Sequence, residues 1–252
     1  MAHARLTMGV FDQNGFEVRF EWGAQGAREA GRDARVIVVV DVLRFTTTVD
    51  AAVTRGAMVY PYRWRDYSAA QFAKKVGAVL AVRQEETTPD RPFSLSPISM
   101  DSARSGSRIV LPSPNGAEVS IVASEHGTEC LAGCLRNASA VAAAALAIGP
   151  PIAVIAAGER WKTTEGLRPC FEDMVGAGAI LHALGALKLS PEASIAAAAF
   201  RDSSSDLERL LLDCSSGREL LERGFSDDVM WCAKLDVSST VPRLNDGAFS
   251  AS

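Results

Sequence analysis

The amino-acid sequence predicts an α/β fold: a parallel or mixed sheet with helices on its faces, followed by a helical C-terminal third. Unbroken apolar runs at 36–40 and 152–157 are typical of strands that are buried on both faces of a sheet. Strand and helix patterns alternate from 36 to 82 in the order βαβαβ, which indicates a parallel sheet. From 191 to 234 the patterns are helical.

Local signals place the individual elements. The segment 16–22 alternates apolar and charged side chains, as does a strand with one wet face near a sheet edge. Gly56 closes the helix after the first buried strand, and 83–106 is a long loop of the kind that is often functional. The tail from Pro242 is expected to fray beyond Asp246. Further strands are predicted at 57–62, 78–82, 108–111 and 130–133, and further helices at 66–76, 117–124, 139–148, 171–180, 191–200, 204–213, 216–223 and 229–234.

The composition indicates a globular protein of 252 residues, organised as one domain over 1–252 or as two intimately packed halves, about 1–125 and 126–252. The net charge of −4 argues against nucleic acid as the main partner, because a phosphate backbone is bound by a basic face. No signal-peptide pattern is visible, and no apolar run reaches the roughly 20 residues that span a bilayer. We therefore expect a cytoplasmic protein with no membrane partner, either a monomer or a homodimer.

Histidine and cysteine give no sign of a metal or disulfide framework. The three histidines are widely spread along the chain. The five cysteines are odd in number and include no CxxC pair, which is typical of reduced thiols in a cytosolic protein.

A polar cluster directly follows the first buried strand. Asp41 ends the strand, Arg44 comes three residues later, and the hydroxyls of Thr46, Thr47 and Thr48 follow where a helix is expected to start. A carboxylate is costly to bury unless a cation or hydrogen-bond donors meet it. A carboxylate, a guanidinium and hydroxyls beside a helix N-terminus suit a phosphate group and a divalent ion. The alternative is structural: Asp41 pairs with Arg44, and the threonines are ordinary caps.

Two later strands also end in polar residues. One is followed by Ser113, Asn115 and Gly116, which offer donors and backbone freedom at a helix start, although a plain strand-to-helix turn has the same composition. The other is followed by Glu159, a second metal ligand or acid–base group. Ligands of open α/β sheets bind outside the carboxyl ends of the strands, so we expect these strand ends to converge on one cleft.

Two acidic residues, Glu172 and Asp173, occupy the first turn of a predicted helix. Acids in this position offset the helix dipole, which is the interpretation we favour for Glu172. Asp173 becomes a reserve metal ligand if the helix start faces the same cleft.

Several short blocks follow one another in a characteristic order. They are Val-Asp-Val-Leu-Arg-Phe-Thr-Thr-Thr (40–48), Ser-Pro-Asn-Gly (113–116), Asn-Ala-Ser-Ala-Val (137–141), Ala-Gly-Glu (157–159), Glu-Asp (172–173) with the following Gly-Ala-Gly-Ala-Ile, Gly-Phe-Ser-Asp-Asp (224–228) and Val-Pro (241–242). In their joint order they resemble the 2-phosphosulfolactate phosphatase (ComB-like) family from about Val36 to Gly247. The resemblance implies a three-layer α/β/α fold and a magnesium-dependent phosphatase. The family's founding substrate is 2-phospho-3-sulfolactate, in a route to coenzyme M.

The resemblance is incomplete after the third strand. Family members typically have a Gly-Glu-Arg-like patch and then Gly-Phe-Asp-x-Gly-Asn-Ser-Pro, whereas this chain has Val-Arg-Gln-Glu (82–85) and Phe-Ser-Leu-Ser-Pro (93–97). A non-catalytic phosphate- or anion-binding protein of the same fold is therefore the alternative hypothesis. A nucleotide-dependent Rossmann enzyme is disfavoured, because no G-x-G-x-x-G follows the first strand.

The residues and the resemblance together assign roles for a small phosphorylated anionic substrate and Mg²⁺. Asp41, Arg44 and Glu159 are the predicted catalytic residues, with Asp41 acting as metal ligand or nucleophile. The predicted metal ligands are Asp41, Glu159 and, in reserve, Asp173, because Mg²⁺ prefers carboxylate oxygens, water and phosphate. The predicted phosphate-binding residues are Arg44, Thr46, Thr47, Thr48, Ser113, Asn115, Gly116 and Arg160. Candidates for a second anionic group are Arg83, Arg91 and Arg160.

Overall fold

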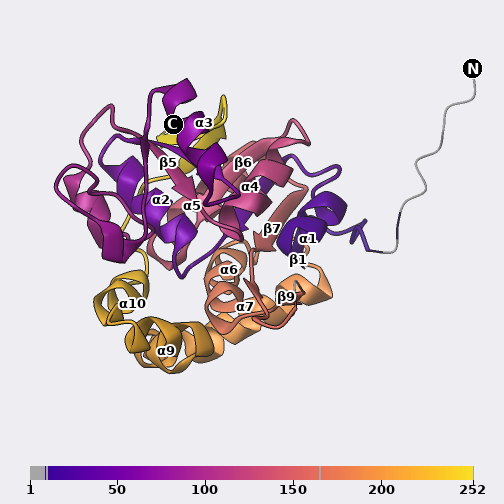
Figure 1. Cartoon of the computed structure of the whole chain (residues 1–252). Helices are drawn as coiled ribbons and strands as arrows, with labels where there is room; N and C mark the ends of the chain where they lie inside the picture. The colour runs from indigo at the N-terminus through magenta and orange to yellow at the C-terminus, as the bar shows by residue number, and fades with distance from the viewer. Residues whose placement is uncertain (1–8, 10, 165, 252) are drawn as a thin grey trace, which may run out of the picture.

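A twisted sheet with helices on both faces forms the centre of the molecule (Figure 1); the computed structural model describes residues 9, 11–164 and 166–251. Within these residues nine strands form one mixed sheet, in the order β1-β7-β2-β6-β10-β11-β3-β5-β4. The three-layer α/β/α fold class is therefore confirmed. The strands are β1 (Val18–Trp22), β2 (Val36–Val40), β3 (Met58–Tyr62), β4 (Val79–Leu80), β5 (Arg108–Pro112), β6 (Glu129–Gly133), β7 (Ile152–Ala156), β10 (Pro242–Asn245) and β11 (Ala248–Ala251).

The strand β2 separates two apolar core layers, because every one of its side chains is buried. Val36, Val38 and Val40 face the layer that includes α5, α6 and α7, whereas Ile37 and Val39 face the layer that includes α1, α2 and α4. This arrangement confirms the strand that was expected to be buried on both faces. The helices are α1 (Gly23–Ala30), α2 (Phe45–Thr54), α3 (Tyr67–Val76), α4 (Gly116–Ser124), α5 (Ala138–Ile148), α6 (Phe171–Ala183), α7 (Pro191–Ser203), α8 (Leu207–Asp213), α9 (Ser215–Glu222) and α10 (Ser226–Cys232).

Two groups of parallel strands make up the sheet. The strands β1, β7, β2 and β6 pair in parallel, and so do β3, β5 and β4. An antiparallel hairpin, β10–β11, lies between the groups: β10 pairs with β6 and β11 pairs with β3. No helix in the described part of the chain has the length and apolar character needed to cross a membrane.

The expectation that the chain frays beyond Asp246 is wrong. The residues on both sides of this position form β10 and β11, and Phe249 is fully buried with its ring 6.4 Å from that of Phe45. Asp246 and Gly247 have φ angles of 50° and 79°, the left-handed values of a tight hairpin turn. The Asp-Gly pair was the sequence signal for this hairpin.

A small hairpin and several short helices near the C-terminus complete the fold. The hairpin pairs β8 (Glu159–Arg160) with β9 (Leu167–Arg168). Figure 1 shows α9 and α10 side by side at one end of the molecule, in orange and yellow. The stretch 83–106 contains no α-helix but has two 3₁₀ turns, η1 (Gln84–Glu86) and η2 (Ile98–Ser102).

Candidate active site

Asp41 lies immediately after β2 and is only 6% exposed. Its Oδ1 accepts a hydrogen bond from the amide of Phe45 at 3.0 Å, and its Oδ2 accepts one from the amide of Gly116 at 2.8 Å. These amides belong to the first residues of α2 and α4, so the carboxylate lies at two helix N-termini, where negative charge is favoured. A Cβ at Gly116 would lie 2.7 Å from Oδ2 of Asp41 and 2.5 Å from the Phe45 ring, so the close approach requires glycine.

The three polar strand ends meet at one place. Asn115 follows β5 and Glu159 follows β7, and the Asn115 side-chain amide donates to Oε2 of Glu159 at 2.9 Å. Asp41, Ser113, Asn115 and Glu159 all line one cavity of about 690 Å³. The structure thus brings together the residues that were expected to converge.

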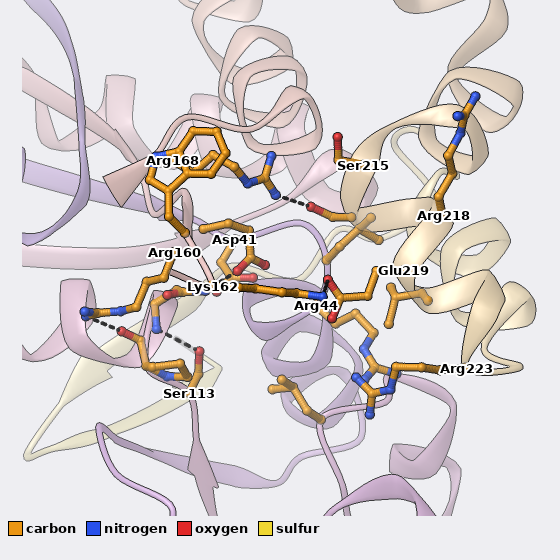
Figure 2. Close-up of a pocket in the computed structure, with 18 of the residues that line it drawn as sticks. Asp41, Arg44, Ser113, Arg160, Lys162, Arg168, Ser215, Arg218, Glu219 and Arg223 are labelled. Carbon is orange, nitrogen blue, oxygen red and sulfur yellow. Dashed lines mark hydrogen bonds and ion pairs between the residues drawn. The ribbon is translucent and has the colours of Figure 1, made fainter. Parts of the chain in front are cut away.

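This cavity, which we call the main cavity, has a wall that is rich in positive charge. Figure 2 shows Asp41 near the middle, with the labelled cationic side chains around it and Arg218 pointing away. The hairpin β8–β9 and the helix α9 provide most of this wall. The cationic residues that line the main cavity are Arg44, Arg160, Lys162, Arg168, Arg218 and Arg223.

Sequence reasoning missed the part of this wall that comes from Arg168 and α9. Arg168 donates to Oγ of Ser216 at 3.1 Å, and Lys162 lies 3.4 Å from the carboxylate of Glu219. The sequence predicts neither a helix or strand nor a functional role for the segment that contains Lys162 and Arg168. No local pattern in that segment predicts its contact with a helix some fifty residues later.

The hydroxyls of the three threonines, which were predicted to bind phosphate, already make hydrogen bonds within the protein. All three side chains are fully buried inside α2 and hydrogen-bonded to main-chain atoms: Thr46 to Asp41, Thr47 to Val42, and Thr48 to Leu95. The amides of Thr46 and Thr48 donate to carbonyl oxygens, and that of Gly116 donates to Asp41. These contacts disfavour the phosphate-binding role predicted for the threonines, because the Asp41 carboxylate lies at the N-terminus of the same helix.

Arg44 is buried and held from several sides. It forms an ion pair with Asp228, donates to the Gln84 side chain at 2.6 Å, and lies with its guanidinium carbon 5.3 Å from the centre of the Phe225 ring. The suggested Asp41–Arg44 pair is therefore not what the structure contains. Asp228 lies in the first turn of α10, is 1% exposed and also accepts a hydrogen bond from Ser96.

Asp173 ties strand ends together and does not line the main cavity. Its two carboxylate oxygens accept hydrogen bonds from the amides of Val42, at 2.8 Å, and Gly158, at 2.9 Å. The reserve metal-ligand role is thus disfavoured, because Asp173, unlike Asp41, does not line the main cavity. Its neighbour Glu172 is 2% exposed and lies 3.5 Å from the sulfur of Cys214.

Burial and mutual repulsion perturb the acidic residues. Burial raises the pKa of Asp41 to about 6, against the opposing effect of the amides of Phe45 and Gly116. Burial also raises the pKa of Glu159 to about 7, and the negative charges of Asp41 and Glu172 add to this shift. The pKa of Asp173 is raised by burial and then by the charge of Asp41. The site therefore concentrates negative charge that a cation would relieve.

The donor chemistry of the site fits a hard divalent cation in part. Asp41 and Glu159 supply oxygen ligands that face the main cavity, as Mg²⁺ requires. Within the described residues, however, no three His, Cys, Asp or Glu side chains are grouped as metal ligands. A cation here would take its remaining ligands from water and substrate, which is the usual arrangement for Mg²⁺.

Ser113 and Arg160 both line the main cavity, but they differ in exposure and in their partners. Ser113 is buried, and its hydroxyl accepts from the amide of Asn115 at 3.3 Å. Arg160 is 38% exposed and forms an ion pair with Glu118, so its charge is shared with that carboxylate. Arg91 lines neither this cavity nor the neighbouring one described below.

Fold and site define an α/β protein with a charged cavity at the ends of its strands, and comparison with known proteins gives the family. A family model described as 2-phosphosulpholactate phosphatase matches residues 25–247. The 2-phosphosulfolactate phosphatase of Methanothermobacter thermautotrophicus is 31% identical over 211 residues, which cover 83% of this chain and 87% of that protein. The chain belongs to the 2-phosphosulfolactate phosphatase family, as the sequence blocks predicted.

Bacterial relatives also carry the name of this family. A probable 2-phosphosulfolactate phosphatase of Thermotoga maritima is 31% identical over 221 residues, covering 86% of this chain and 92% of the relative. A protein of Thermus thermophilus with the same name is 33% identical over 216 residues, covering 83% and 87%. The similarity therefore extends through nearly the whole fold.

Proposed function

We propose that the protein is a phosphoric monoester hydrolase that removes phosphate from a small anionic hydroxy acid, 2-phosphosulfolactate or a close relative, with Mg²⁺ as cofactor. The observation that carries the proposal is the main cavity itself. It brings Asp41 and Glu159 together with several arginines, in a member of this family. Carboxylates for a cation and guanidinium groups for phosphoryl oxygens are the parts that phosphate hydrolysis needs.

Asp41 and Glu159 are the residues that would hold the metal. A bound Mg²⁺ would supply Lewis-acid charge to the phosphoryl group and lower the pKa of a bound water. Asp41 is suited to a holding role rather than to nucleophilic attack, because main-chain amides hydrogen-bond both its oxygens. Such donors stabilise the carboxylate and fix its orientation.

The arginines of the main cavity would bind the substrate. Arg44 is oriented by Asp228 and Gln84, so its guanidinium reaches the cavity in a fixed position. Arg168 is held by Ser216 on the side of the cavity formed by α9. Guanidinium groups bind phosphoryl oxygens through charge-assisted, paired hydrogen bonds. We propose that these two arginines stabilise the charge on the transferred phosphoryl group.

The proposal is tested by phosphate release from 2-phosphosulfolactate and a panel of phosphorylated hydroxy acids, with Mg²⁺ or with EDTA. The informative variant is Glu159→Gln, because a glutamine carbonyl can still accept the hydrogen bond from Asn115. We expect kcat to fall by about a hundredfold or more, as is usual for loss of a catalytic electrostatic group. Glu125→Gln, an exposed change outside the cavity, is the matched control.

The outcomes separate the two hypotheses for this fold. Turnover that requires Mg²⁺ and is lost in Glu159→Gln, but kept in Glu125→Gln, supports the phosphatase. A folded protein that binds phosphate but releases none from any ester would instead be a non-catalytic anion-binding protein. A phosphatase that is equally active in EDTA would contradict the role proposed for the metal.

A further inference from the structure

A second cavity adjoins the main cavity. Its volume is about 490 Å³, and it shares Arg44, Leu95 and Arg223 with the main cavity. Its other lining residues come from η1, from the two residues before it and from the segment before α3. The second cavity is therefore a space into which a ligand in the main cavity can extend, past the Arg44 side chain.

Arginines outnumber carboxylates among the residues that line the second cavity. Four arginines line it, but only two carboxylates do, Glu85 and Glu86. Arg223 pairs with Glu85 at 2.8 Å, and Arg83 lies 4.0 Å from Glu86. The arginines are Arg44, Arg65, Arg83 and Arg223.

Arg65 is the least compensated of these cations. Its guanidinium donates to the carbonyl of Pro112 at 3.4 Å, and it forms no ion pair within the described residues. Its pKa is lowered, first by partial removal from water and next by the positive charge of Arg83. Like charges that crowd a cavity wall are relieved when an anion binds between them.

Arg44 physically connects the two cavities. Its Nη1 is held by Asp228 and by Gln84, and Gln84 belongs to η1, which forms a wall of the second cavity. One guanidinium thus stands between the phosphoryl-binding part of the main cavity and the arginines of the second cavity.

We propose that the second cavity is an oxyanion subsite in which Arg65 and Arg83, with Arg223 and Arg44 at the junction, bind a carboxylate or sulfonate group. The ligand group is the distal acid of a substrate whose phosphoryl group occupies the main cavity, so this part of the inference rests on the proposed function. A free oxyanion would satisfy the same chemistry. The subsite differs from the one predicted from sequence, since it adds Arg65 and leaves out Arg91 and Arg160.

The first test compares two esters with the same carbon skeleton. One is 2-phosphosulfolactate, and the other is 2-propyl phosphate, which lacks both additional acidic groups. For Arg65→Gln we expect kcat/KM for the acidic ester to fall about tenfold further than that for 2-propyl phosphate, the value of one lost charge-assisted contact. If Arg65→Gln folds poorly, the same ratio of kcat/KM values is measured for Arg83→Gln, because Arg83 is highly exposed. Arg91→Gln, in the same loop but outside both cavities, should leave the ratio unchanged.

The second test measures sulfate binding to the purified protein by calorimetry, without any ester. Weaker sulfate binding in Arg65→Gln, together with the changed ester ratio, supports the subsite and assigns it to the substrate. Weaker sulfate binding with an unchanged ratio supports a subsite for a free oxyanion. If both measurements match those of the wild type and Arg91→Gln, the proposal is overturned. If the wild type hydrolyses no ester, the proposed function fails, and the sulfate titration still decides whether the subsite exists.

Discussion

The two sides of the main cavity are built in different ways. On the acidic side, Asp41 and Asn115 sit in the turns after β2 and β5, and main-chain amides of α2 and α4 hold the Asp41 carboxylate. On the cationic side, Lys162 and Arg218 are 81% and 69% exposed. Main-chain amides at two helix N-termini therefore fix the Asp41 carboxylate, whereas exposed contacts position Lys162 and Arg218. Under the proposed function, the buried Asp41 would serve the chemistry and the exposed wall would serve ligand discrimination.

Arg44 is the exception among the cations, because it is buried, and breaking its support should have the largest effect. Asp228→Ala leaves the guanidinium without its buried partner, so we expect a loss of about 3–5 kcal/mol in the free energy of unfolding. Urea denaturation measures this loss. The neighbouring and exposed Asp227→Ala should change it by no more than about 0.5 kcal/mol. Equal effects of the two changes would show that the ion pair does not support the fold.

The acidic side should be visible in the pH dependence of stability. The folded-state pKa of Glu159 is raised from 4.5 to about 7, so this group adds stability at low pH that is lost as the pH rises through about 7. Relative to Glu159→Gln, the wild type in EDTA should therefore lose about 2 kcal/mol between about pH 5 and pH 8. Urea titrations at several pH values test this. If the free energy of unfolding changed with pH in the same way in both proteins, the raised pKa of Glu159 would be contradicted.

The exposed wall should affect ligand binding more than folding. Arg168→Gln removes a guanidinium that Ser216 holds at the cavity, so we expect kcat/KM for the best ester to fall about tenfold while the melting temperature stays the same. Arg218→Gln is the matched variant, because Arg218 points away from Asp41 in Figure 2. A similar loss in both variants would mean that the wall acts through its overall charge instead of through one contact.

The smallest effect is expected for Lys162→Gln. The pair between Lys162 and Glu219 is exposed on both sides, with side chains 81% and 48% accessible. Exposed ion pairs contribute little, so the free energy of unfolding should change by no more than about 0.5 kcal/mol. A loss above 1 kcal/mol, measured by urea denaturation, would show that this pair fastens the hairpin β8–β9 to α9 more firmly than its exposure implies.

Much of the sheet was predictable because the signals are local. The run 36–40 has an apolar residue at every position, and only a strand with two covered faces makes use of such a pattern. The hairpin β10–β11 was missed although its Asp-Gly turn is a strong signal, because position near the end of the sequence was given more weight than turn chemistry. Its place between β6 and β3 depends on pairings over more than a hundred residues, which no local pattern encodes.

The acidic half of the site was predictable for the same reason, and the rest was not. Asp41 and Glu159 each follow a buried strand, so topology alone brings them together. The sequence shows that the threonine hydroxyls lie near a helix start, but not that the Asp41 carboxylate accepts a hydrogen bond at that start. Arg168 and the residues of α9 meet only through tertiary packing.

The central position of β10–β11 has a consequence for how the protein is made. A ribosome releases a chain from its N-terminus onward, and domains generally fold as units. Both parallel groups of strands emerge before residues 242–251 do, yet those residues join the groups and supply the buried Phe249. Until they appear, the nascent protein has two open strand edges, at β6 and β3, which are the surfaces that mispair with other chains. Premature termination in this short segment should therefore give aggregated product instead of a shortened enzyme.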